Sequence, residues 1–178
     1  EEKLKRQVSA GMLAGIVLCT GVAVLIGIFS GQVMRLMQVD EAILGLAARY
    51  LRVIMMGLVF SFIYNYMASM LRAMGDSKSP LIFLAVSAAV NIAGDLFFVV
   101  VLRMGVMGAA LSTVLCEGLS AVLCWVYVYR RVPLLRLGRG WLFFEGGILK
   151  ITLSYGIVSA LQQSTVQMGK LAVQAFVN

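Results

Sequence analysis

Long stretches without a charged residue constrain this chain more than any other feature. The first runs from Gln7 to Met34, 28 residues between Arg6 and Arg35. One helix needs about 20 apolar residues to cross about 30 Å of hydrocarbon. Hydrophobic residues make up 61% of the sequence and charged residues 13%, a composition that excludes an ordinary soluble domain. We therefore predict an all-α polytopic membrane helix bundle of about five spans, at residues 7–34, 53–71, 81–102, 106–129 and 148–178.

The connections between these spans carry local signals of helix ends. Asp40 and Glu41 predict the start of a helix, because carboxylates near the first amides satisfy unpaired N–H groups. In the polar connection over residues 72–80, Gly75 suits a left-handed helix end and Pro80 suits the first turn of the next helix. Residues 103–105 predict a tight turn, and residues 131–147 predict an arginine- and glycine-rich linker.

The basic residues predict how the spans are oriented. Five spans place five basic residues on one side of the membrane and ten on the other, the side of the N-terminus: Lys3, Lys5, Arg6, Arg72, Lys78, Arg130, Arg131, Arg136, Arg139 and Lys150. The positive-inside rule then places the N-terminus in the cytoplasm, and we expect the chain in the cytoplasmic (inner) membrane. The same loop charges favour contact with anionic lipid and argue against nucleic acid as a partner.

The residue types that enzymes and metal proteins use are scarce. The chain has no histidine, and its three cysteines do not form a Cys-x-x-Cys pair. Their positions within apolar runs indicate small buried side chains. Histidine-dependent triads, HExxH zinc sites and bis-histidine haem ligation are excluded. We expect neither an enzyme nor a cofactor.

Two acidic residues lie deep inside the predicted spans, Asp95 and Glu117. A charge at the bilayer centre costs about 2.5–3.5 kcal/mol on insertion scales, so each requires a compensating role. Asn91 and Asp95 share a helix face four residues apart, as do Thr113 and Glu117 on the next, antiparallel helix. The two polar stripes predict either a proton or cation site, with Na⁺ as a candidate ion at Asp95, or hydrogen bonds that hold the helices together.

Other polar residues lie inside the predicted spans without a charge. Asn65 lies in the second span, and Gln162 and Gln163 lie in the middle of the fifth. We interpret Glu117, Gln162 and Gln163 as groups that contact a substrate or pack between helices.

Three ordered motifs resemble the MATE family (multidrug and toxic compound extrusion). They are Leu71-Arg72-Ala73-Met74-Gly75-Asp76-Ser77-Lys78-Ser79-Pro80, Asn91-Ile92-x-x-Asp95, and the stretch from Gly105 to Thr113. The resemblance implies a twelve-helix, two-lobe transporter. In it, residues 1–130 are helices three to six of the first lobe, 131–147 the linker between lobes, and 148–178 the start of helix seven.

The same resemblance implies a function and a site. A DinF-like member is a cation-coupled antiporter, driven by H⁺ or Na⁺, that exports drugs or organic metabolites. Its ion site matches Asp95, Asn91, Thr113 and, less directly, Asn65, and an aspartate on helix one completes it. The NorM-like branch uses an acid on helix seven, whereas residues 146–178 contain none. The implied partners are a cationic, amphipathic small molecule, the lipid bilayer and the transporter's remaining helices.

Two other interpretations stay open at this point. The related fold also serves flippases of lipid-linked oligosaccharides. Since the chain starts with Glu1 and stops within an apolar run, we also expect a piece of a larger protein, which leaves an inert fragment as an alternative.

Overall fold

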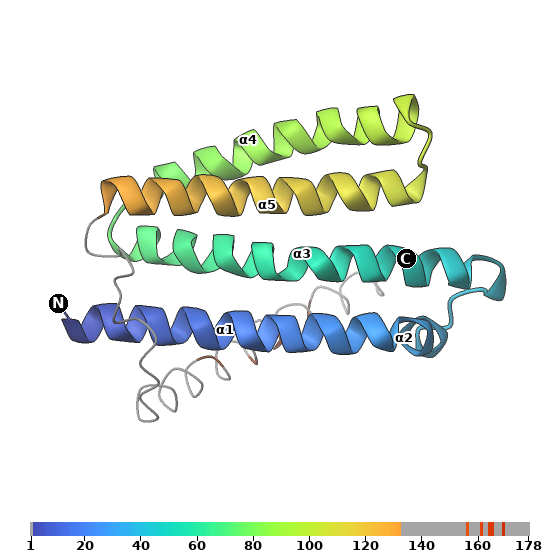
Figure 1. The fold of residues 1–178 in the computed structure, drawn as a ribbon, viewed down its shortest axis with the longest axis horizontal. Coiled ribbons are helices and arrows are strands. Elements are labelled where there is room, and N and C mark those ends of the chain that lie inside the picture. The colour runs from blue at the N-terminus through green and yellow to red at the C-terminus, as the bar shows by residue number, and fades with distance from the viewer. Residues whose placement is uncertain (1, 133–155, 157–160, 162–163, 166–168, 170–178) are drawn as a thin grey trace. The chain divides into compact units, whose positions relative to one another are not determined.

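The computed structural model describes residues 2–132 and five single residues between 156 and 169, and every regular element among them is helical (Figure 1). The chain divides into two units, Glu1–Gly11 with Leu137–Asn178, and Met12–Arg136; the second is described below. Its elements are listed in chain order: α1 (Glu2–Ile28), which enters from the first unit, α2 (Ser30–Leu36), α3 (Glu41–Ala73), α4 (Lys78–Asp95), the π-helix η1 (Leu96–Val101) and α5 (Val106–Arg131).

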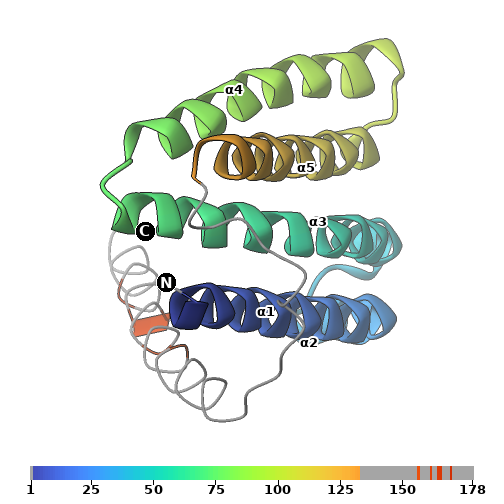
Figure 2. The ribbon, with the colours of Figure 1, turned by 60° about the vertical axis from the view of Figure 1, so that its left-hand side comes forward.

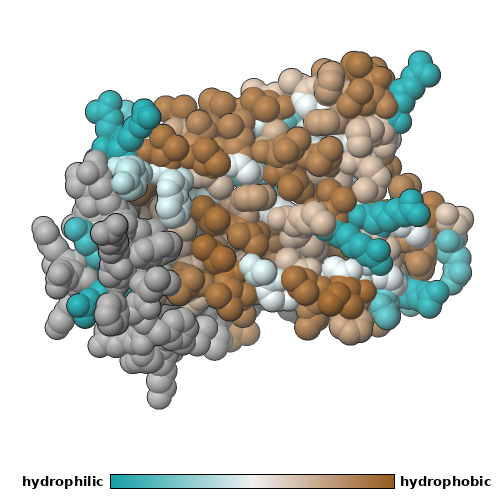
Figure 3. Space-filling model, viewed as in Figure 1, coloured by the Kyte–Doolittle hydropathy of each residue, from teal (hydrophilic) through white to brown (hydrophobic). Residues whose placement is uncertain are grey.

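Four helices in the described part of the chain are long and apolar enough to cross a membrane. They are Lys5–Ile28, Glu41–Ala73, Lys78–Val101 and Val106–Arg131, which match four of the five predicted spans. Figure 3 shows apolar side chains over the middle of the helices and polar ones toward the helix ends. The all-α membrane bundle is therefore confirmed. The predicted linker beyond Val132 and the predicted fifth span, with Gln162 and Gln163, lie outside the described residues.

The first predicted span is not a single helix, and this corrects the prediction for residues 7–34. α1 ends at Ile28, and α2 begins two residues later at Ser30. The Ser30 side chain is fully buried, and its Oγ accepts a hydrogen bond of 2.7 Å from Nε of Arg52 on α3. Burial of this hydroxyl against a cationic donor gives the break at Phe29 a tertiary cause.

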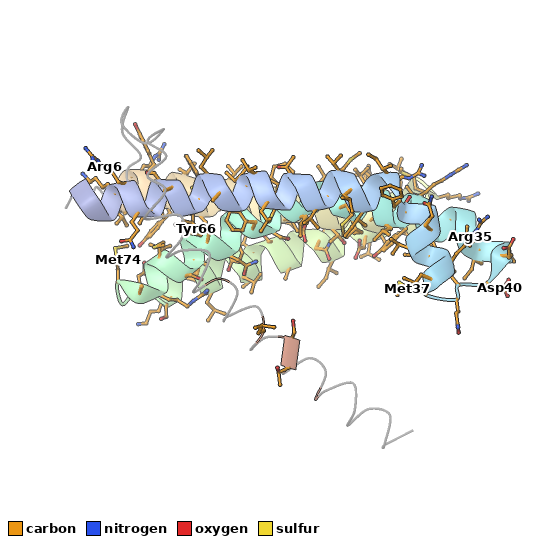
Figure 4. All side chains as sticks on the ribbon, turned by 90° about the horizontal axis from the view of Figure 1, so that it is seen from below. Arg6, Arg35, Met37, Asp40, Tyr66 and Met74 are labelled. Carbon is orange, nitrogen blue, oxygen red and sulfur yellow. The ribbon has the colours of Figure 1, made fainter. Side chains whose placement is uncertain are left out.

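The helix ends follow the local signals in the sequence. The Asp40 side chain accepts a hydrogen bond from the Ala42 amide, 3.0 Å away, at the start of α3. Gly75 has the left-handed φ of +88° after α3, and Pro80 is the third residue of α4. Figure 4 shows Arg35, Met37 and Asp40 together at one end of the helices and Met74 at the other.

α5 lies between α3 and α4 in both ribbon views (Figures 1 and 2). Its buried side chains recur every four residues and are mostly small: Gly108, Ser112, Cys116, Ser120, Cys124 and Val128. Small residues let two helix backbones approach closely. A β-carbon on Gly108 would lie only 3.0 Å from the Phe98 carbonyl carbon, so this glycine favours the close contact between α5 and η1.

Two tyrosine hydroxyls hold the corner where α3 turns into α4. Tyr64 of α3 donates to the Pro80 carbonyl oxygen at 2.8 Å, a buried bond. Tyr127 of α5 donates to Oδ2 of Asp76 at 3.0 Å, and its ring packs edge-on against Phe83 of α4 at 5.3 Å. The corner therefore joins α3, α4 and α5.

The buried Tyr64 bond gives a stability prediction. Tyr64→Phe removes the donor and leaves the Pro80 carbonyl without this partner, so the free energy of unfolding should fall by about 1 kcal/mol. Tyr50→Phe is the matched control, because Tyr50 is exposed and makes no hydrogen bond within the part of the chain that the structure describes. Thermal unfolding in detergent measures both. Equal melting temperatures for the two variants would contradict the assignment.

Asp76 predicts a weakening of this corner in acid. The Ser79 amide, which donates to Oδ1 at 3.0 Å, and the Ser79 and Tyr127 hydroxyls lower the pKa of Asp76 below its ordinary value of 3.8. A lowered folded-state pKa stabilises the fold above the unfolded pKa, and this stabilisation is lost as pH falls through the lower folded value. The melting temperatures of wild type and Asp76→Asn should therefore converge below about pH 4. A difference in melting temperature that stays constant as the pH is lowered would contradict this prediction.

Candidate functional site

The polar seam between α4 and α5 is built around Asn91 and Ser112. Nδ2 of Asn91 donates to Oγ of Ser112 at 3.1 Å, and Ser112 Oγ in turn lies 3.1 Å from the Asn91 carbonyl oxygen, to which it donates. Gly94 makes room for this pair, because a β-carbon on it would lie 2.5 Å from Ser112 Oγ. Two helices at this separation leave space only for small polar groups between them.

Asp95 is the feature of this seam that packing does not explain. Its Oδ1 is buried and has no hydrogen-bond partner among the residues that the structure describes. A carboxylate oxygen removed from water without a donor is costly in free energy. A bound proton or cation would satisfy it.

The helix changes geometry directly after Asp95. The α-helical part of this span ends at Asp95, and η1 follows with the Leu102 amide bonded to the Phe97 carbonyl, five residues earlier. Single π-helical turns inside longer helices occur frequently at functional sites. The sequence contained no signal for this widening.

Ser112 and Cys116 belong to the seam, and sequence reasoning missed both. Ser112 is 1% exposed, and Cys116, one turn farther along the same face of α5, is also buried. The available signal was their spacing, since they lie four residues apart on one face of α5. Thr113 had been singled out instead, although it is turned by about 100° from Ser112.

Thr113 and Glu117 lie on a face of α5 outside its seam with α4. Oγ1 of Thr113 donates to the Ala109 carbonyl oxygen of its own helix at 3.0 Å, so its lone pairs remain available to a ligand. The Glu117 carboxylate lies against Gly57 of α3. In two antiparallel helices, the residues that directly follow a pair of contacting residues both point to the same side of the helix pair. Asp95 and Thr113, which follow Gly94 and Ser112, therefore share a side.

Asn65 lies farther along the bundle. It is exposed on α3, and its Nδ2 donates to the Ser61 carbonyl oxygen at 2.8 Å. Asn65 is eight residues beyond Gly57, which is level with Glu117, so it lies about 12 Å from Glu117 along the axis, on the side away from Asp95. Asn91, Asp95 and Thr113 thus lie within about 8 Å of one another along the helix axis, whereas Asn65 lies farther away. Residues 2–132 contain no group of three histidine, cysteine or acidic side chains arranged to hold a metal ion.

The seam gives a prediction about packing. Gly94→Ala places a methyl group against Ser112 Oγ, so the Asn91–Ser112 pair must separate. The variant should lose about 1–3 kcal/mol of stability, as overpacked positions do. Gly118→Ala is the control, because its β-carbon meets Phe60 only at an ordinary 3.9 Å. Chemical unfolding of both variants tests this, and a Gly94→Ala protein as stable as Gly118→Ala would contradict the described packing.

Four apolar helices and a buried carboxylate define a multi-pass membrane protein with an acidic site inside its spans. The MatE family model matches residues 1–97, more than half of the chain. The chain therefore belongs to the MatE family, as its motifs predicted.

Curated relatives carry matching names. The chain is 34% identical over 171 residues to "Probable multidrug resistance protein YpnP" of Bacillus subtilis, covering 93% of this chain and 38% of that protein. It is 30% identical over 187 residues to "Probable multidrug resistance protein YoeA" of the same organism, covering 100% and 40%. "Protein DETOXIFICATION 43" of Arabidopsis thaliana is 28% identical over 117 residues, covering 62% and 22%. The chain thus spans about two fifths of the two Bacillus relatives. No solved structure matches it.

Proposed function

We propose that this chain forms the ion-binding part of the first lobe of a cation-coupled antiporter that exports drugs or organic metabolites across the cytoplasmic membrane. Family membership and the names of the relatives support export of small molecules. The single observation that carries the coupling is the buried, unpartnered Oδ1 of Asp95.

The chemistry of the surrounding side chains suits a proton or a hard cation. Asp95 supplies the charge, while the Asn91 side chain and the Thr113 hydroxyl supply neutral oxygens within about 8 Å along the helix axis. Hard cations prefer carboxylate, carbonyl and hydroxyl oxygens. A carboxylate oxygen also accepts a proton, so a proton can occupy the same place.

Coupling requires the ion to bind one arrangement of the helices more tightly than the other. The ion at Asp95 favours one state, and substrate release follows from the different affinities of the two states. An organic cation suits an acidic interior as the exported molecule. We place the N-terminus of this segment in the cytoplasm on the basis of its loop charges.

The test is Asp95→Asn in the protein expressed from its complete coding sequence and reconstituted in liposomes. Efflux of a cationic dye driven by a proton or sodium gradient should be abolished, because a neutral amide cannot bind the ion as the carboxylate does. Membrane insertion should stay intact. Glu41→Gln, an exposed acid at the start of α3, is the matched control and should transport normally. Normal ion-driven efflux by Asp95→Asn would reject the proposal.

A further inference from the structure

Glu117 is a second carboxylate inside the membrane spans, and the Asp95 site does not use it. It lies eleven residues from the start of α5 and fourteen from its end, close to the middle of a helix that crosses the bilayer. No described side chain donates a hydrogen bond to it or forms an ion pair with it. An intramembrane carboxylate without a fixed partner indicates a functional site.

The fold provides space for this carboxylate. A β-carbon on Gly57 of α3 would overlap Oε2 of Glu117, so only glycine allows the side chain to lie there. Gly57 itself is buried. If Glu117 had only a solvating or lipid-facing role, its side chain would not need to pack against a neighbouring helix backbone.

A second, independent observation lies at the same level. Ser87 of α4 is 5% exposed, and its hydroxyl has no hydrogen-bond partner within the described part of the chain. α4 and α5 run antiparallel, and Asn91 lies opposite Ser112. Ser87, one turn before Asn91, is therefore level with Cys116, which is one turn after Ser112 and next to Glu117 in the sequence. This buried hydroxyl faces the seam between α4 and α5 at the level of Glu117, whereas the Glu117 carboxylate itself lies against α3.

Thr113 and Glu117 follow one another along one flank of α5, on the side to which Asp95 of α4 also turns. The contacts Gly94–Ser112 and Phe98–Gly108 place Asp95 level with residues 108–111 of α5. Glu117 is then about 10 Å farther along the axis, with the Thr113 hydroxyl between them. About 10 Å is too long for direct transfer of a cation between the two carboxylates, and the Thr113 hydroxyl oxygen between them shortens each step.

We propose that Glu117 forms a second cation site, and that the coupling cation passes between Asp95 and Glu117 past the Thr113 hydroxyl. The inference rests on the proposed function of Asp95. The charged and titratable groups nearest Glu117 are Cys116 on α5, Asp95 on α4, and Arg52 and Tyr64 on α3, five and seven residues from Gly57. None of them pairs with the Glu117 carboxylate.

The experiment counts cations bound per protein, using the product of the complete coding sequence purified in detergent. Radioactive sodium is the probe for Na⁺, and a pH-indicator dye reports protons. Glu117→Gln should bind one cation fewer than wild type while the Asp95 site still fills. Ion-driven efflux should fall by about tenfold or more, within the range of ion–substrate coupling. Glu117→Asp should keep part of the cation binding and part of the efflux, and Glu41→Gln should change neither quantity.

The outcomes separate this inference from the proposed function. Normal efflux by Asp95→Asn rejects the proposed function. If Asp95→Asn abolishes efflux while Glu117→Gln leaves both the cation count and the efflux unchanged, only the second site is rejected. An unchanged cation count with weaker dye binding in Glu117→Gln would assign Glu117 to the substrate and overturn the inference. Gly57→Ala, which crowds the carboxylate without removing it, should reproduce the loss of one cation even if Glu117→Gln folds poorly.

Discussion

The close approach of α4 and α5 is the constraint on which the rest of this structure depends. Gly94 and Gly108 bring the two backbones together, and Ser112 fills the remaining space. At this distance the Asn91 amide reaches across the seam, which ties the helices by hydrogen bonds in a medium where the hydrophobic effect gives no driving force. The polar groups of the site are therefore part of the packing.

The same approach leaves Asp95 in an unusual position. The helix on which it lies widens directly after it into η1, and the seam beside it is closed by Ser112 and Cys116. Its Oδ1 is buried there without a donor. A membrane protein can keep such a group only when another interaction offsets the free-energy cost, and a transported ion provides that interaction in one state of the cycle.

Single residues and run lengths predicted most of the fold. The uncharged runs located four spans, and Asp40, Gly75 and the turn at residues 103–105 marked helix ends, because these effects are local. The break at Phe29 was missed, since it depends on the Arg52–Ser30 bond between different helices. Position 29 is neither glycine nor proline, so that residue gives no local signal of the break.

The site was only partly predictable for a similar reason. Asn91 and Asp95 were identified from chemistry alone, as charged or amide groups inside apolar runs. The choice of Thr113 over Ser112 as the residue facing Asn91 depended on how α5 is rotated about its axis, and Gly94 and Gly108 decide that rotation. The level of Asn65 relative to Asp95 follows from the register of α3 on α5, which the contact of Gly57 with Glu117 defines.

The most direct test of the account is infrared difference spectroscopy on the protein expressed from its complete coding sequence. Spectra taken across a pH or sodium step report the protonation of buried carboxyl groups through their carbonyl stretch. The account predicts a band that appears when the coupling ion is exchanged and that is missing in Asp95→Asn. A wild-type spectrum without such a band, or one that is unchanged in Asp95→Asn, would contradict the claim that Asp95 binds the coupling ion.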